Sequence, residues 1–223
     1  MSTLIDWPLI DTVLLDMDGT LLDLNFDNHF WLQHLPRRYA QHHGLDPEQA
    51  RRHLYRRFDA ERGTINWYCL DYWSNELAMD IAQLKEEVAH LVAVHPNVIA
   101  FLGALRASRR RAVMVTNAHH KSLQLKLRHT DLGDHLDAVI CAHDLGLPKE
   151  EPAFWPALQH HEDYNPERTL LIDDNIDVLR AAQHGGIGHL LAMARPDSRK
   201  PVQATEEFAA IEHFSEIMPP AGH

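Results

Sequence analysis

Several features are scarce in this chain of 223 residues. It has only two cysteines, Cys69 and Cys141, far apart in apolar surroundings, which excludes a disulfide framework and a CxxC metal site. A reducing, cytoplasmic setting is therefore expected. The first ten residues contain an acid and no basic residue, so no signal peptide is expected there. The longest stretch without Asp, Glu, Lys or Arg, Val88 to Leu105, contains His90, His95 and Pro96 and does not read as a membrane span.

Positive charge is also scarce: 21 Lys and Arg stand against 32 Asp and Glu, a formal net charge of −11. Such a chain repels nucleic-acid backbones and anionic membranes, so neither is expected as a partner. Sequences typical of P-loop ATPases, zinc proteases and serine hydrolases are absent as well. With 45% hydrophobic and 24% charged residues, the chain is expected to be soluble and globular. We further expect a small molecule as its partner and favour a monomer.

What is present is an alternation of short apolar runs with longer helical patterns, typical of a parallel sheet covered by helices. Each run is brief and rich in leucine or β-branched residues, as buried strands are. The expected strands are Val13–Leu15, Ala112–Val115, Ala138–Cys141, Leu170–Ile172 and His189–Ala192. Helices are expected between the last four of them, at Lys121–His129, Pro152–His161 and Ile176–His184.

About a hundred residues separate the first two expected strands, which is far longer than an ordinary crossover connection. This interval is helical in pattern: Asp46-Pro47 is typical of a helix start, and Asn66–Met79 and Ile81–Val94 have helical apolar periodicity. We therefore expect an α/β fold with a Rossmann-like three-layer core, formed by residues 1–23 and 96–195. Residues 24–95 are expected to form a helical cap. Residues 196–223 are expected to be a tail that packs on the core, with a short helix near Glu206–Phe214.

Two acids follow the first expected strand in Asp16-Met17-Asp18-Gly19-Thr20. Residues two apart in an extended segment point to the same side, so both carboxylates can face one small volume, while Gly19 lets the chain turn away. A calcium loop is the rival interpretation, but its glycine comes sixth and here it comes fourth. The alternative without a functional role is that one aspartate caps a helix N-terminus and the other is an ordinary surface acid.

Three further motifs follow later strands: Thr116-Asn117, Lys149, and Asp173-Asp174-Asn175. Each alone would be ordinary turn, surface or helix-cap chemistry. Together, all fall at carboxyl ends of expected strands, where open α/β sheets place their ligand crevice. Converging carboxylates would repel one another, and oxygen-only donors favour Mg²⁺ over zinc as the cation that relieves this repulsion. A hydroxyl, backbone amides and a lysine suit a phosphoryl group.

This set resembles the four motifs of the haloacid dehalogenase-like hydrolase superfamily, in order and in type, over roughly residues 12 to 190. The long insert looks like the helical cap of that superfamily. Asp16–Leu24, Phe26-Asp27-Asn28 and Asn66-Trp67-Tyr68-Cys69-Leu70-Asp71-Tyr72-Trp73-Ser74 further resemble the bacterial GMP/IMP nucleotidases. The second acid, Asp18, argues against a true dehalogenase, which lacks it.

The resemblance implies a role for each matching residue. Asp16 would be the nucleophile and would form an aspartyl-phosphate, and Asp18 would be the general acid and base. Mg²⁺ would be held by Asp16, the main-chain carbonyl of Asp18, and Asp174, with Asp173 acting through water. The phosphoryl oxygens would be held by Thr116, the Asn117 amide and Lys149. The implied activity is Mg²⁺-dependent hydrolysis of purine 5′-mononucleotides.

Substrate choice is expected to depend on the cap. Trp67 and Tyr72 belong to its densest aromatic cluster and could stack on a purine, although helical spacing equally allows them to be cap core. Asp27 and Asn28 are candidates for polar contact with the base or ribose. Two alternatives stay open: a phosphatase or phosphomutase for another metabolite such as a sugar phosphate, and a phospho-accepting receiver domain. In receivers the acid pair comes first in the chain, whereas here it comes last.

Overall fold

A six-stranded, fully parallel sheet with strand order β3-β2-β1-β4-β5-β6 forms the centre of the protein. The computed structural model describes residues 4–220. The first five strands agree with the predicted ones to within one residue at either end. The strands are β1 Thr12–Leu15, β2 Arg111–Thr116, β3 Ala138–Cys141, β4 Thr169–Asp173, β5 His189–Met193 and β6 Ala210–Ile211. The expected α/β, Rossmann-like fold is confirmed.

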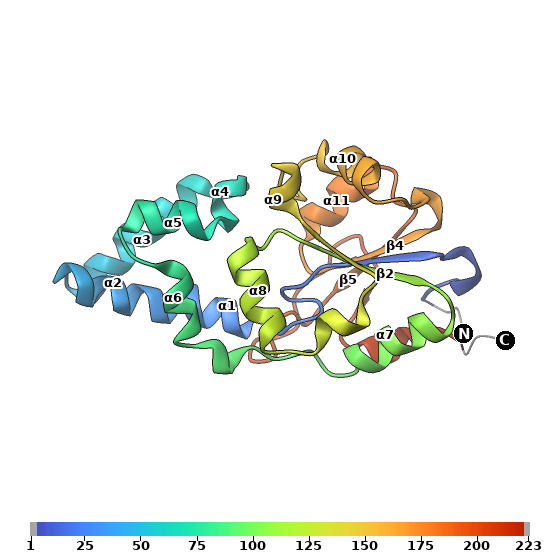
Figure 1. Ribbon diagram of the computed structural model, residues 1–223, viewed down its shortest axis with the longest axis horizontal. Coiled ribbons are helices and arrows are strands. Elements are labelled where there is room, and N and C mark those ends of the chain that lie inside the picture. Colours follow the sequence, from blue (N-terminus) through green and yellow to red (C-terminus); the bar gives the residue numbers. More distant parts are fainter. Residues whose placement is uncertain (1–3, 221–223) are drawn as a thin grey trace.

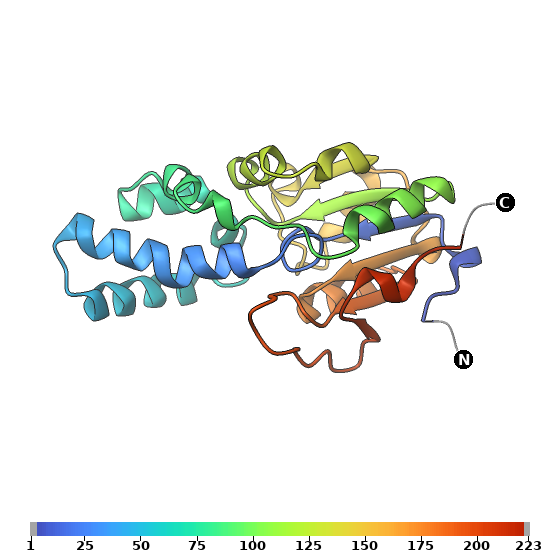
Figure 2. The ribbon, with the colours of Figure 1, turned by 90° about the horizontal axis from the view of Figure 1, so that it is seen from below.

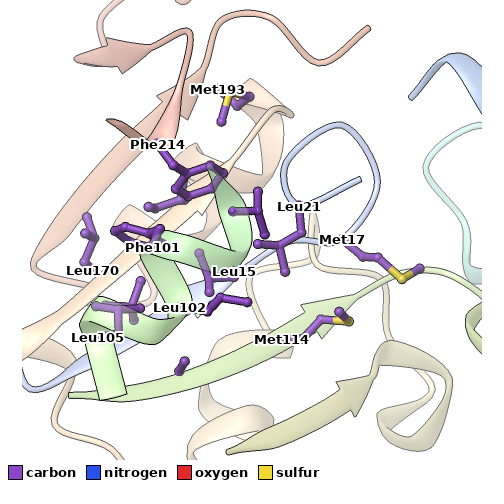
Figure 3. Close-up of a cluster of buried hydrophobic side chains, with 14 of the residues drawn as sticks. Leu15, Met17, Leu21, Phe101, Leu102, Leu105, Met114, Leu170, Met193 and Phe214 are labelled. Carbon is purple, nitrogen blue, oxygen red and sulfur yellow. The ribbon is translucent and has the colours of Figure 1, made fainter. Parts of the chain in front are cut away.

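Helices cover both faces of this sheet, because successive strand residues point to opposite sides (Figure 1). Leu15 and Met114 face the layer that contains α7, whereas Leu14 and Val113 face α10 and α11. Figure 3 shows the first of these clusters, in which the ring centres of Phe101 and Phe214 lie 4.7 Å apart and Leu105 lies beyond Phe101 along the helix. The covering helices are α7 Val98–Ala107, α8 His120–Arg128, α9 Ala142–Leu145, α10 Phe154–His161 and α11 Ile176–His184.

The strand order reverses direction at β1, which pairs with β2 on one side and β4 on the other. The connections leaving these neighbouring strands diverge, and a crevice opens outside their carboxyl ends. Asp16 follows β1 directly, while Thr116 and Asp173 are the last residues of β2 and β4. The topology thus brings three of the sequence motifs to one edge of the sheet.

A second body of helices lies beyond this edge, at the left of Figures 1 and 2, and has an apolar cluster of its own. Its centre includes Phe26, Phe30, Leu54 and Trp73, and Leu125 of α8 joins it from the sheet side. The helices are α1 Asn25–His29, the π-helical turn η2 Phe30–His34, α2 Leu35–His43, α3 Pro47–Glu61, α4 Ile65–Tyr68, α5 Leu70–Leu77 and α6 Ile81–Glu86. The remaining short turns of helix are η1 Trp7–Leu9, η3 Ala89–Leu91, η4 Leu132–His135, η5 Pro166–Arg168 and η6 Phe214–Ile217.

Local chemistry sets several of these boundaries. The Asp46 side chain accepts from the backbone of Glu48 and Gln49, so α3 starts where the sequence predicts. The expected helix Asn66–Met79 is divided at Cys69, which is extended and whose thiol accepts from the Tyr72 amide as the cap of α5. The expected helix Ile81–Val94 is shorter, because α6 ends at Glu86.

The C-terminal segment differs from the expectation of a helix near Glu206–Phe214. Residues 210–211 extend the sheet instead, in register with β5, and the helical turn η6 begins only at Phe214. Pairing with β5 satisfies the backbone of this short segment, and Phe214 and Ile217 are buried in the core. Within residues 4–220, no helix has the length and apolar character needed to cross a bilayer.

Candidate active site

One cavity of about 360 Å³ collects most of the residues singled out from the sequence. It lies between the carboxyl edge of the sheet and the helical body, and its volume falls in the range of pockets that hold small organic ligands. Ten predicted residues line it: Asp16, Asp18, Asp27, Asn28, Trp67, Thr116, Asn117, Lys149, Asp173 and Asp174. Tyr72 does not line it; its hydroxyl donates to Glu61 Oε1 at 2.7 Å.

Three carboxylates converge at the sheet end of this cavity. Asp16, Asp173 and Asp174 each offer an oxygen within 4.8 Å of the others. Burial raises the pKa of Asp16 to about 7, and the neighbouring charge of Asp173 adds to the effect. The pKa of Asp174 is raised well above its usual value by burial and by the other two acids. Oxygen-only donors whose charges repel one another are a fitting site for a hard divalent cation.

Gly19 brings the first motif against the last. Its φ of +91° lies in the region that favours glycine, as the expected sharp turn requires. A Cβ at this position would stand 2.6 Å from the Asp174 carboxylate. The loop closes on itself through hydrogen bonds from Gly19 to Leu22 (2.7 Å) and from Leu22 to Met17 (2.8 Å). Only a glycine lets the two acidic motifs approach this closely.

Lys149 lies between two of the acids. Its ammonium group donates to Asp16 Oδ1, to Asp173 Oδ2 at 2.7 Å and to the Val115 carbonyl at 3.1 Å. Burial alone would lower the pKa of Lys149, but the two carboxylates raise it, so the lysine is a permanent cation. Asp173 is further held by the Asn175 amide at 2.9 Å, whereas no Lys or Arg within residues 4–220 forms an ion pair with Asp174.

Asp18 forms an ion pair with Lys126 of α8, and Asp27 shares this lysine. Lys126 Nζ lies 2.6 Å from Asp18 Oδ2 and 2.7 Å from Asp27 Oδ2, and Lys126 is 1% exposed. The other Asp27 oxygen accepts from Lys85 at 2.6 Å. Burial raises the pKa of Asp18 to about 6, against the opposing charge of Lys126. Burial would also raise the pKa of Asp27, but the two lysines hold it at about 2.

A hydrogen-bond network centred on Glu150 joins the motifs. Glu150 accepts from Asn117 Nδ2 at 2.9 Å and from Asn175 Nδ2 at 3.0 Å, and Asn117 Oδ1 accepts from the Lys149 amide at 2.9 Å. The hydroxyl of Tyr68, in α4, also donates to Glu150. Thr116 Oγ1 accepts from the Ala118 amide at 3.0 Å. The loops after β2, β3 and β4 are therefore fixed to one another and to the helical body.

The far wall of the cavity is aromatic and apolar. It is formed by Leu24, Trp31, Leu32, Phe58, Trp67, Tyr68, Leu70 and Trp73. Trp73 is 1% exposed and donates its indole N–H to the Trp67 carbonyl at 2.9 Å, which places it mainly in the core of the helical body. Asn28 also lines the cavity, and its amide donates to Asp197, in the loop after β5, at 2.7 Å. The cavity thus has an ionic end and an apolar end.

Sequence reasoning missed Lys126, Lys85 and Glu150. A signal for Lys126 was available: it falls four residues after Ser122 and three after Leu123, on the buried face of its helix. A lysine on an apolar helix face must find an acid inside the protein. Glu150 follows Lys149 directly, and apart from that position nothing in the sequence indicates that it belongs to the site.

The model of the haloacid dehalogenase-like hydrolase family matches residues 10–186, and the chain belongs to this family. It is 39% identical to the GMP/IMP nucleotidase YrfG of Escherichia coli, over 96% of this chain and 97% of that protein. It is 26% identical to the phosphoglycolate phosphatase of Chromobacterium violaceum, over 79% and 82% of the respective chains.

Among solved structures, a phosphatase of this family from Thermococcus onnurineus superimposes with a TM-score of 0.76 at 22% identity, over 93% of this chain and 96% of the other. The chain is therefore a hydrolase, with the acids and the lysine expected for phosphomonoesters at the carboxyl edge of its sheet. Membership in this family leaves the receiver-domain alternative without support.

Proposed function

We propose that the protein is a Mg²⁺-dependent phosphatase that hydrolyses purine 5′-mononucleotides, GMP or IMP, to nucleoside and phosphate in the cytoplasm. The observation that carries this proposal is the division of one cavity into an ionic end and an aromatic end. A mononucleotide has the same division, with a phosphate at one end and a planar base at the other. The 39% identity to a GMP/IMP nucleotidase along nearly the whole chain supports the same substrate class.

Asp16 is the proposed nucleophile. Its carboxylate attacks phosphorus in line, the bond between phosphorus and the ester oxygen breaks, and the leaving oxygen takes a proton from Asp18. In the second half of the reaction, Asp18 removes a proton from water. The water oxygen attacks phosphorus, the bond to Asp16 breaks, and orthophosphate leaves. A pKa of about 6 for Asp18 suits a group that must give and take a proton near neutrality.

Mg²⁺ would be held by Asp16, by the main-chain carbonyl of Asp18 and by Asp174. Its charge, when bound, neutralises the carboxylates and the phosphoryl oxygens. Asp173 is proposed to act through water, since Lys149 and the Asn175 amide already engage both of its oxygens. Asp174, in contrast, has no cationic side-chain partner among the ion pairs of residues 4–220 and is free to coordinate.

The phosphoryl group is proposed to be held by Thr116, the Asn117 amide and Lys149. Lys149 already spans the nucleophile Asp16 and Asp173, so its cation lies where charge develops on the phosphoryl oxygens. At the other end, Trp67 is proposed to stack on the purine and Asn28 to contact base or ribose. Asp27 also lines the cavity, but both of its oxygens accept from lysines, one of which it shares with Asp18, and this favours Asn28 as the direct contact.

A panel of phosphate esters tests the proposal. With Mg²⁺ present, GMP and IMP should be turned over with a higher kcat/KM than ribose 5-phosphate, glucose 6-phosphate or 2-phosphoglycolate, and EDTA should abolish all turnover. Equal kcat/KM values for sugar phosphates and purine nucleotides would remove the base from the proposal. A preference for 2-phosphoglycolate would favour the alternative of a small-metabolite phosphatase, which the 26% identical relative represents.

A further inference from the structure

A buried chain of four charges links the proposed acid–base to the helical body. In spatial order it runs Asp18, Lys126, Asp27, Lys85, with successive contacts of 2.6, 2.7 and 2.6 Å. The signs alternate and sum to zero. Both lysines are 1% exposed, so each depends on protein carboxylates for its stabilisation. The loop after β1 and helix α8 supply the first two members, and α1 and α6 supply the last two.

We propose that Lys126 is a positioning residue that holds the Asp18 carboxylate in the orientation needed for proton transfer to the leaving oxygen. Lys126 Nζ lies 2.6 Å from Oδ2 of Asp18, and Asp18 itself lines the cavity, so the ion pair fixes a carboxylate that borders the site. A carboxylate on a loop would otherwise rotate freely about its side-chain bonds. The second contact of Lys126, to Asp27, prevents the ammonium group from following such a rotation.

The surroundings of the two lysines make this arrangement rigid. Lys85 lies 5.1–5.6 Å from the ring centres of Phe26, Phe30 and Trp31, and Lys126 lies 5.4 Å from Phe26. Aromatic faces attract cations and fill the space that water would need. Among the ion pairs of residues 4–220, Lys126 contacts Asp18 and Asp27, and Lys85 contacts Asp27. The orientation of Asp18 therefore depends on side chains of the helical body as well as on those of the sheet.

The test uses the leaving group, and it rests on the roles proposed above for Asp16 and Asp18. An alkoxide needs a proton from Asp18 in order to leave, whereas p-nitrophenolate leaves without one. In Lys126→Met, transfer of phosphate from IMP to the enzyme should slow at least about 100-fold, within the range that general acid catalysis contributes. The pre-steady-state burst of p-nitrophenolate from p-nitrophenyl phosphate should slow less than about tenfold, because this leaving group needs no proton from Asp18.

After this burst, the variant should accumulate a covalent phosphoenzyme visible by intact mass, because Asp18 must also activate the water. A purely structural role for Lys126 would slow both substrates by the same factor, and that result, or no slowing at all, would overturn the proposal. Lys126→Met leaves two buried acids and one lysine and could fail to fold. The double variant Lys126→Met/Asp27→Asn leaves Asp18 and Lys85, restores the charge balance, and should show the same dependence on the leaving group.

Asp27→Asn alone serves as the matched comparison, because it keeps the contact between Lys126 and Asp18. Because it removes the second contact of Lys126, transfer from IMP should slow more than the p-nitrophenolate burst, but by a smaller factor than in Lys126→Met. If the wild-type protein does not hydrolyse IMP, the proposed substrate class fails. The role of Lys126 is then tested with 2-phosphoglycolate, also an alkyl phosphate, so that the two proposals fail separately.

Discussion

The ammonium group of Lys149 lies 2.7 Å from Asp173 Oδ2, and both side chains are almost completely buried. On its other side the same ammonium group donates to Asp16. One cation is therefore shared by a carboxylate at the end of β4 and by the one that directly follows β1. This sharing allows two acids to lie side by side in a site with little water.

Replacing Lys149 with Met should abolish turnover and destabilise the fold, because it leaves two buried carboxylates without their cation. Breaking such a pair costs about 3–5 kcal/mol, reduced to the extent that the acids take up protons. Chemical denaturation measures this change. Lys121→Met is the control: its ion pair with Asp71 is half exposed, so its loss should destabilise the protein far less. Equal destabilisation by the two variants would contradict the argument.

Asp16→Asn should reduce turnover below detection while the protein stays folded. Asparagine has the shape of aspartate but cannot attack phosphorus, and it removes one of three mutually repelling charges. Circular dichroism and thermal melting of the metal-free variant should therefore match or exceed the wild type. Turnover at the wild-type rate would show that the nucleophile lies elsewhere.

Magnesium should raise the Tm of the wild-type protein, because a ligand that binds only the folded state stabilises it, by about 2.7 kcal/mol at 100 times its Kd. Asp174→Asn should lose this rise entirely. Asp173→Asn should retain part of it, since Lys149 and the Asn175 amide hold the Asp173 side chain. The reverse order of the two variants would exchange the roles proposed for the two acids.

Trp67→Ala should raise the KM for IMP about 5- to 150-fold, which corresponds to the roughly 1–3 kcal/mol of base–aromatic stacking. The KM for ribose 5-phosphate, which has no base, should change little. Tyr72→Phe is the matched aromatic control, because Tyr72 lies outside the cavity lining and its hydroxyl serves Glu61. Parallel changes in the two KM values after Trp67→Ala would show that the indole supports the fold and does not bind the base.

His143 gives a prediction for pH. Burial, together with the nearby His119 and His120, lowers the pKa of His143 from 6.5 to about 4. The unfolded chain therefore binds a proton before the folded one does, and stability is lost as the pH falls from about 6.5 towards 4. His143→Gln should show a smaller fall in Tm between pH 7 and pH 5 than the wild type. His42→Gln, on the exposed end of α2, should keep the wild-type fall.

The sequence was sufficient for the core of the fold, because buried parallel strands have a strong apolar signal and the acids follow them immediately. It was insufficient where tertiary contacts decide. The division at Cys69 depends on a thiol that caps α5, and the strand at Ala210–Ile211 exists only because β5 offers an edge. Neither has a local pattern.

The same limit applies to the site. Aspartates at the strand ends could be predicted from position alone, and the structure brings them into one cavity with Lys149. The partners of Asp27 could not, because Lys85 and Lys126 come from helices far away in the chain. Of the two aromatic candidates, Trp67 faces the cavity and Tyr72 faces Glu61, a difference that helical spacing does not reveal.

The contact between Gly19 and Asp174 has a consequence for mutational tolerance. Even a single methyl group at position 19 would require an unfavourable backbone conformation and would displace the Asp174 carboxylate, which follows the neighbouring strand β4. In a saturation library scored for phosphate release, this position should accept no replacement, although a glycine performs no chemistry of its own.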